Sequence, residues 1–194
     1  MFTTATCHIV GTAPLTMSRK HDATALKGEK PDDYDARTWR NKLTVSEDGS
    51  TVVLNSFGIK MCIASGAKYT KRKIEGQGNS TWTAKFMSGI ALAEAPRLNI
   101  DPASVPHIAV SVNADGVRGS GKRVTRRFPL MMQWDATFDV YILDPIITED
   151  IFREMLEIAG MFIGVGQFRP ENGGTNGRFK VAKVTWQDNR QMAA

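Results

Sequence analysis

A glycine-rich, basic segment near the end of the chain is the part of the sequence best suited to hold an anion. Residues 164–180 contain five glycines, two arginines, one lysine and a single acid. Glycine allows sharp bends and lets a ligand approach backbone N–H groups, and nearby cations attract phosphate. The alternative is a long connection between two core elements, with the glycines serving only the backbone. The residues that we predict to line a phosphate path are Gly164, Gly166, Gln167, Arg169, Gly177 and Arg178.

Two further basic clusters lie earlier in the chain. Between Gly116 and Trp134 the sequence has five cations and no acid, whereas a solvated loop usually mixes both signs. This imbalance favours a flexible phosphate-binding arm that carries Arg118, Lys122, Arg123, Arg126 and Arg127. A shorter cluster, Lys71, Arg72 and Lys73, either binds the same anion or forms a solvated helix end, where cations oppose the helix dipole. The candidates for stacking on bases are Phe168 and Trp82, each of which also suits a core position.

Groups able to catalyse a reaction are scarce. His8, His21 and His107 are scattered, and the sequence contains no Walker, HExxH or GxSxG motif. Cys7 and Cys62 are too far apart for a disulfide framework and have no zinc-ligand spacing. We therefore expect no catalytic residue, no metal and no cofactor. The alternative is a metal-independent endoribonuclease with His21 as the base, flanked by the cations Arg19 and Lys20.

The composition is that of a globular protein with a polyanionic partner. The 194 residues carry a net charge of +5, and 42% of them are hydrophobic, which is enough for a real core. We expect one domain over residues 1–194, with two insertions, a charged excursion at 18–41 and the basic arm at 113–127. The first residues lack the pattern of a signal peptide, and no stretch approaches the length of a membrane span. The expected location is the cytoplasm, with no membrane partner.

The order of predicted elements indicates an α+β fold. Strands are expected at 4–17, 90–98, 108–112, 128–132, 137–143 and 179–186, and a hairpin at 43–54 with its turn at Asp48 and Gly49. Helices are expected from Asn55 or Ser56 to about residue 69, over 81–88, and after Thr148, which is a good N-cap. Helices between hairpins favour an antiparallel sheet with helices on one face. The predicted fold is ferredoxin-like, of the RNA-recognition type, with long basic insertions.

The C-terminal motif resembles the RAMP superfamily of CRISPR–Cas systems, and most of all the backbone subunits that coat guide RNA. The resemblance is carried by residues 162–169 (Phe-Ile-Gly-Val-Gly-Gln-Phe-Arg) and 173–180 (Gly-Gly-Thr-Asn-Gly-Arg-Phe-Lys), where a helix, a glycine-rich loop and a last strand follow one another. It implies binding of single-stranded RNA, or else DNA, through backbone contacts, and copies that assemble along the strand. The chain also resembles a stand-alone phage or prophage relative of these subunits.

Two questions of assembly follow from the sequence. The excursion at 18–41 is too polar for a core, yet Tyr34 and Trp39 are costly to leave in water, so we expect it to contact another copy in a homo-oligomer. CRISPR-complex proteins are further possible partners under the resemblance. A third reading is a viral structural protein, or an inhibitor that mimics a CRISPR subunit.

Overall fold

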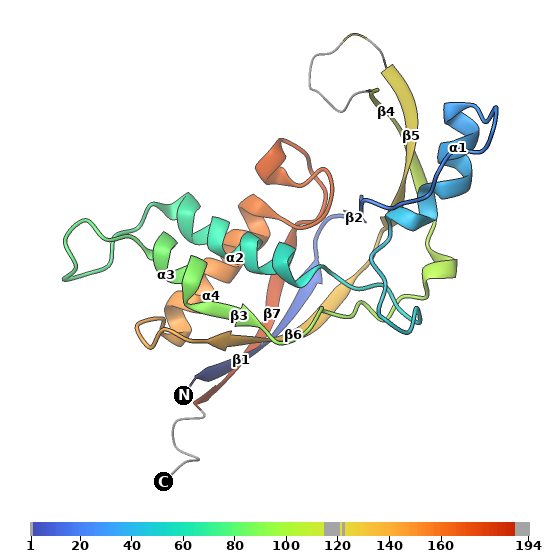
Figure 1. Ribbon diagram of the computed structural model, residues 1–194. Coiled ribbons are helices and arrows are strands. Elements are labelled where there is room, and N and C mark those ends of the chain that lie inside the picture. Colours follow the sequence, from blue (N-terminus) through green and yellow to red (C-terminus); the bar gives the residue numbers. More distant parts are fainter. Residues whose placement is uncertain (1, 115–120, 122, 189–194) are drawn as a thin grey trace.

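A four-stranded antiparallel sheet forms the base of the molecule (Figure 1). The computed structural model describes residues 2–114, 121 and 123–188. The strand order in the sheet is β3-β6-β1-β7. These strands are β1 (Thr3–Gly11), β3 (Ile90–Leu92), β6 (Asp135–Ile142) and β7 (Phe179–Asp188). The expected strand at 90–98 is shorter than predicted and ends at Leu92.

Three helices cover one face of this sheet (Figure 1). They are α2 (Ser56–Thr70), α3 (Trp82–Ser88) and α4 (Glu149–Ile158). With the strands, the chain order is β1-α2-β3-β6-α4-β7, apart from the small α3. This order and the order of strands in the sheet are those of a ferredoxin-like fold, as predicted. The buried faces of β1 and β6 pack against α2 and α4 around Ile9, Phe138 and Phe152.

Local sequence explains where the two long helices begin and end. The Asn55 side chain accepts a hydrogen bond from the Gly58 N–H at the start of α2. Thr148 caps α4 in the same way through the Ile151 N–H. Gly66 allows α4 to approach α2, because a Cβ at this position would lie 2.6 Å from the Met155 carbonyl oxygen.

The end of α4 leads directly into the glycine-rich segment. A π-helical turn, η3 (Ala159–Ile163), continues α4, and Gly164 follows with φ at +72°. A positive φ favours glycine, so the chain leaves the helix at this residue. A short 3-10 turn, η4 (Pro170–Asn172), lies within the segment before β7 begins.

A second antiparallel sheet projects from the first (Figure 1). It consists of β2 (Leu15–Thr16), β5 (Arg123–Met131) and β4 (His107–Asn113), in that order across the sheet. The single strand expected at 4–17 is therefore two strands, one in each sheet, with Pro14 between them. The strand expected at 128–132 begins earlier, at Arg123, so the prediction of a flexible arm is wrong for residues 123–127, which are β-strand.

Two of the connections between the sheets, β1 to β2 and β5 to β6, meet at Trp134. The Gly11 N–H donates to the Trp134 carbonyl oxygen at 2.8 Å, and the Trp134 Nε1–H donates to the Ala13 carbonyl oxygen at 2.9 Å. A Cβ on Gly11 would lie 2.3 Å from the indole Nε1. The buried Trp134 therefore fixes the two chain crossings against each other.

The charged excursion packs on the second sheet instead of standing free. It contains α1 (Pro31–Thr38) and the 3-10 turn η1 (Trp39–Lys42), which lie against β5. Trp39 is 8% exposed, and its ring centroid lies 4.7 Å from that of His107 on β4. The expectation that Trp39 needs a neighbouring copy to leave water was therefore wrong.

Two remaining elements are small. The hairpin expected at 43–54 consists of a single bridge between Val45 and Val52 around the predicted Asp48-Gly49 turn. A further 3-10 turn, η2 (Pro102–Ser104), precedes β4.

Candidate nucleic-acid interface

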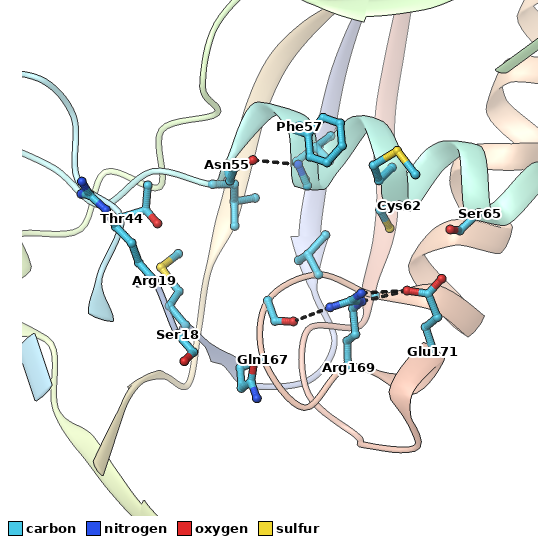
Figure 2. Close-up of a pocket in the computed structure, with 18 of the residues that line it drawn as sticks. Ser18, Arg19, Thr44, Asn55, Phe57, Cys62, Ser65, Gln167, Arg169 and Glu171 are labelled. Carbon is cyan, nitrogen blue, oxygen red and sulfur yellow. Dashed lines mark hydrogen bonds and ion pairs between the residues drawn. The ribbon is translucent and has the colours of Figure 1, made fainter. Parts of the chain in front are cut away.

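A cleft of about 650 Å³ lies between α2, the glycine-rich segment and the chain that follows β2. Figure 2 shows α2 along one side, with Gln167 and Arg169 on the loop opposite, and Ser18 and Arg19 at one end. Its walls come from segments that are more than a hundred residues apart in the sequence. The cleft therefore exists only because the loop is held in place on the core.

Backbone hydrogen bonds to β2 and to the chain just before it hold the glycine-rich loop. The Gln167 N–H donates to the Thr16 carbonyl oxygen at 2.8 Å, and the Thr16 hydroxyl donates to the Gln167 carbonyl oxygen at 2.6 Å. The Gly177 N–H donates to the Pro14 carbonyl oxygen at 2.8 Å. Thr16 is fully buried, so these bonds are shielded from water and the loop is a rigid wall.

Two glycines of the loop allow backbone segments of the protein to pack closely against each other. A Cβ on Gly177 would lie 1.8 Å from the Val165 carbonyl oxygen, and a Cβ on Gly174 would lie 1.8 Å from that of Phe168. Gly164 and Gly177 are buried, whereas Gly166 is exposed. Gly164 and Gly166 line the cleft, and Gly177 supports the loop from behind. The backbone alternative noted from the sequence thus accounts for Gly177.

The charge of the cleft is positive. Its lining carries the cations Arg19, Lys20 and Arg169 and one acid, Glu171, a balance of three positive charges against one negative. Arg169 donates to Glu171 at 2.9 Å and to the Gly166 carbonyl oxygen at 3.3 Å, which fixes its guanidinium against the loop (Figure 2). Arg19 and Lys20 are exposed. This arrangement attracts an anion to the open side of the cleft.

The sequence prediction missed Arg19 and Lys20 as members of this site. They follow β2 directly, and β2 is the strand on which the glycine-rich loop rests. Their adjacency to a strand end was visible in the sequence. Their place in one cleft with Arg169 was not, because the cleft forms between segments about 150 residues apart.

The predicted stacking residues lie away from the cleft. Trp82 is 6% exposed and belongs to the core, which is the alternative noted for it from the sequence. Phe168 is half-buried with φ at +57°, and its ring packs edge-on against Phe128 at 5.0 Å. The side chain on the cleft that is free to stack is Phe57, which is 70% exposed.

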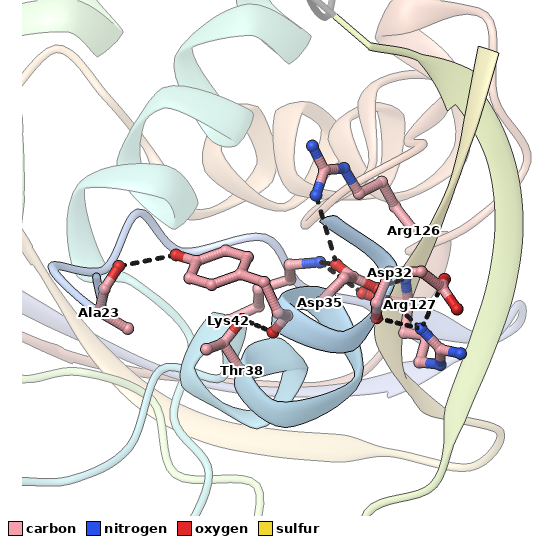
Figure 3. Close-up of polar contacts among 8 residues, drawn as sticks. Ala23, Asp32, Asp35, Thr38, Lys42, Arg126 and Arg127 are labelled. Carbon is pink, nitrogen blue, oxygen red and sulfur yellow. Dashed lines mark hydrogen bonds and ion pairs between the residues drawn. The ribbon is translucent and has the colours of Figure 1, made fainter. Parts of the chain in front are cut away.

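The cations of the arm are tied to α1 through a buried carboxylate (Figure 3). Asp35, which is 1% exposed, accepts hydrogen bonds from the Lys42 ammonium and from the Arg127 backbone N–H, each at 2.7 Å. The Arg127 guanidinium lies 3.5 Å from Asp35 and 3.3 Å from Asp32. The Arg126 guanidinium lies 4.0 Å from Asp35. Arg127 is therefore a structural cation, and the charge of Arg126 is partly balanced.

Among the other predicted cations that the structure describes, Arg123 is exposed and Arg178 is half-buried. Arg123 donates to the Ser111 hydroxyl and carbonyl oxygens across the hairpin at 3.1 and 2.8 Å. Arg118 and Lys122 lie outside the residues that the structure describes. Arg178 donates to the Met161 carbonyl oxygen at 3.0 Å and does not line the cleft.

The cluster of Lys71, Arg72 and Lys73 lies at the C-terminal end of α2, away from the helix end that lines the cleft. All three residues are exposed. Arg72 forms an ion pair with Glu154, and Lys73 donates to the Asn79 side chain at 2.9 Å. Surface pairs of this kind are weak, so these cations stay available to an anion.

The open face of the four-stranded sheet is a poor surface for a polyanion. The two central strands place Asp135 and Asp139 on this face, beside His8 and Thr6. Thr6 donates to Asp139 at 2.6 Å, and His8 lies 3.3 Å from Asp135. Acids in these positions repel phosphate, although Lys183 and the Tyr141 ring lie on the same face. The cleft beside α2 is the better candidate.

The candidate reactive groups lie on separate elements of the described part of the chain. Both cysteines are free, and burial raises the pKa of the Cys7 and Cys62 thiols to about 12, so they stay protonated at neutral pH. The His21 Nδ1 is buried with no hydrogen-bond partner among the described residues. Within those residues no cluster of three or more His, Cys, Asp or Glu side chains is arranged to hold a metal. No helix in the described part of the chain is long and apolar enough to cross a membrane.

Comparison with solved structures identifies relatives of the fold. No protein-family model and no curated protein matches the chain. A chain of the cryo-EM structure of type III-B Cmr-beta bound to cognate target RNA matches with a TM-score of 0.53 and 12% sequence identity. The match covers 96% of this chain and 61% of that chain. This chain is therefore similar in fold to that chain of the Cmr-beta structure.

The crystal structure of Cmr6 from Pyrococcus furiosus is a second match. It has a TM-score of 0.49 and 11% identity, over 92% of this chain and 98% of that chain. Similarity at these identities concerns the fold alone. The resemblance predicted from the glycine-rich motif is confirmed at that level, and this chain spans about 61% of the length of its Cmr-beta counterpart.

Proposed function

We propose that this protein is a non-catalytic binder of single-stranded nucleic acid, with weak sequence preference and RNA as its main partner. The observation that carries the proposal is the cleft, which Arg19, Lys20 and Arg169 line beside a rigid loop. Such a groove tracks a phosphate backbone without selecting bases. The likeness in fold to a chain from a Cmr-beta complex bound to target RNA supports RNA over DNA.

The exposed cations outside the cleft extend this path. Arg123 on the projecting hairpin and the cluster at Lys71, Arg72 and Lys73 add positive charge at a distance from the cleft. We assign Arg126 and Arg127 a smaller part than the sequence suggested, because Asp35 already faces both.

The test compares two double variants of one segment. Arg19→Gln with Lys20→Gln removes two cleft cations, whereas Lys27→Gln with Lys30→Gln removes two exposed cations that do not line the cleft. Each variant lowers the net charge by two from +5. Affinity for labelled oligonucleotides is measured between about 50 and 200 mM salt.

The cleft variant should weaken binding to all sequences alike and reduce the slope of log K against log salt by about 1.4, or roughly 0.7 for each lost phosphate contact. The control variant should keep nearly the slope of the wild type. Equal effects of the two variants would mean that only net charge matters and that the cleft is not the site.

The absence of catalysis is part of the proposal and has its own test. His21 is the one candidate base in the excursion, and a general base must reach the proton it removes. Labelled RNA incubated with the protein in EDTA should stay intact. Cleavage that disappears in His21→Ala would make the protein a metal-independent ribonuclease.

We also propose that the protein acts in an assembly along the strand, with copies of itself or with other CRISPR-type subunits. The projecting hairpin, with β4 exposed over much of its length, offers a surface for a neighbour (Figure 1). Light scattering with oligonucleotides of increasing length should show stepwise gains in mass. One protein per strand at every length would contradict the self-assembly part.

A further inference from the structure

Exposed aromatic side chains lie at both ends of the outer face of α2. Phe57 in the first turn is 70% exposed, and Tyr69 in the last turn is 56% exposed. The Tyr69 ring stacks on the ring of Phe162, with centroids 4.8 Å apart and planes 13° apart. Phe162 is itself 41% exposed. Apolar surface gathered in this way usually marks an interaction site.

These aromatic residues adjoin the positively charged cleft. Phe57, Met61 and Ser65 line the cleft from α2, and Tyr69 is one helical turn beyond Ser65. Phe162 is two residues before Gly164, which also lines the cleft. The twelve residues from Phe57 to Tyr69 span about 18 Å along the helix axis. Phe57 therefore lies in the lining of the cleft, and the Tyr69–Phe162 pair lies outside it, next along the chain to lining residues.

We propose that Phe57 and the Tyr69–Phe162 pair are base-stacking positions for a single strand whose phosphates lie in the cleft. The inference rests on the proposed function. It assigns base stacking to Phe57 and the Tyr69–Phe162 pair, where the sequence analysis had suggested Phe168 and Trp82. Every base has a π face, so stacking on these rings adds affinity without sequence preference. The cations of the cleft, Arg19, Lys20 and Arg169, favour a nucleic acid over an apolar protein segment as the occupant.

The position of the Tyr69–Phe162 ring pair is supported by the surrounding structure. Phe162 belongs to the π-helical turn η3, and Arg178 donates to the carbonyl oxygen of the preceding Met161 at 3.0 Å. The two rings are nearly parallel, so Phe162 supports one face of Tyr69. A base that stacks on Tyr69 extends an existing stack and meets a side chain with few rotamers to lose.

The experiment compares base-bearing and abasic strands. Fluorescence anisotropy gives the affinity of the full chain for labelled RNA and DNA oligonucleotides and for abasic strands of equal length. The variants are Phe57→Ala and Tyr69→Ala, with Tyr69→Phe as the conservative change that keeps the ring. Met132→Ala is the matched control, because Met132 is 65% exposed and does not line the cleft. All of these side chains are exposed, so the core is untouched.

Phe57→Ala and Tyr69→Ala should each weaken binding of base-bearing strands roughly 5- to 100-fold, with little change for abasic strands. Tyr69→Phe and Met132→Ala should bind like the wild type. The stacking role is overturned if the alanine variants lose as much affinity for abasic strands as for base-bearing strands. It is also overturned if neither alanine variant loses affinity while the wild type binds. Both results leave the proposed function standing. A wild type that binds no strand overturns both.

The remaining possibility is that the aromatic surface at Phe57, Tyr69 and Phe162 binds a protein. If Tyr69→Ala reduces self-association in light scattering without nucleic acid, and leaves oligonucleotide affinity unchanged, the patch joins copies of the chain and the stacking role is refuted. Photo-crosslinking with 5-iodouracil strands gives a positive readout. Adducts on Phe57, Tyr69 or Phe162 support the proposal, and adducts confined to other residues contradict it.

Discussion

Asp35, a buried residue of α1, should be essential for the packing of α1 on the second sheet, and its replacement by alanine tests this expectation. Its carboxylate is buried and accepts two hydrogen bonds of 2.7 Å, from the Lys42 ammonium and the Arg127 backbone N–H. Removing one member of a buried ionic group leaves uncompensated charge and costs about 3–5 kcal/mol. We expect Asp35→Ala to lower the free energy of unfolding by about that amount.

Asp32→Ala is the matched control, since it removes the same charge from the same helix. The Asp32 side chain is 66% exposed and lies 3.3 Å from the same Arg127 guanidinium. An exposed pair contributes less than about 1 kcal/mol. Urea unfolding measures both variants, and hydrogen exchange of the Arg127 amide detects a local release of α1. Equal costs for the two variants would refute the argument from burial.

Other predictions concern the loop and the pH response. Gly177→Ala should destabilise the protein by more than about 2 kcal/mol in thermal unfolding, because its φ is +71° and its Cβ would meet the Val165 carbonyl oxygen. Gly76→Ala has φ at +73° and open space, so it should cost only about 1 kcal/mol, and a similar cost for both would contradict the packing argument. The hydrogen bonds from Arg37 hold the pKa of Glu29 at about 2, so this pair stabilises the excursion at neutral pH and is lost as pH falls through 2. Carbon NMR should show that midpoint, and Arg37→Gln should raise it; an unchanged midpoint would mean that Arg37 is not the cause.

The sequence predicted the parts of the fold that depend on near neighbours. The helices α2 and α4 could be located because their caps, Asn55 and Thr148, and their apolar periodicity are local signals. The glycine-rich loop and its fold family were likewise evident from a contiguous motif. The pairing of Asp35 with Arg127 could not be predicted, because the two residues are 92 positions apart and each looks solvated by itself. The same holds for Arg19, whose place in the site depends on where the loop is anchored.

The indole of Trp134 has a consequence for how this protein can diverge. Two of the chain crossings between the sheets pass this one side chain, β1 to β2 through Gly11 and Ala13 and β5 to β6 through its own backbone. Strands β4 and β5 can lengthen or shorten by pairs of residues without disturbing that crossing. A residue inserted between Gly11 and Ala13, which both bond to Trp134, would instead rotate the β4–β5 hairpin relative to the cleft. Among related proteins, the length of the β4–β5 hairpin can therefore vary, whereas its orientation relative to the first sheet should stay the same.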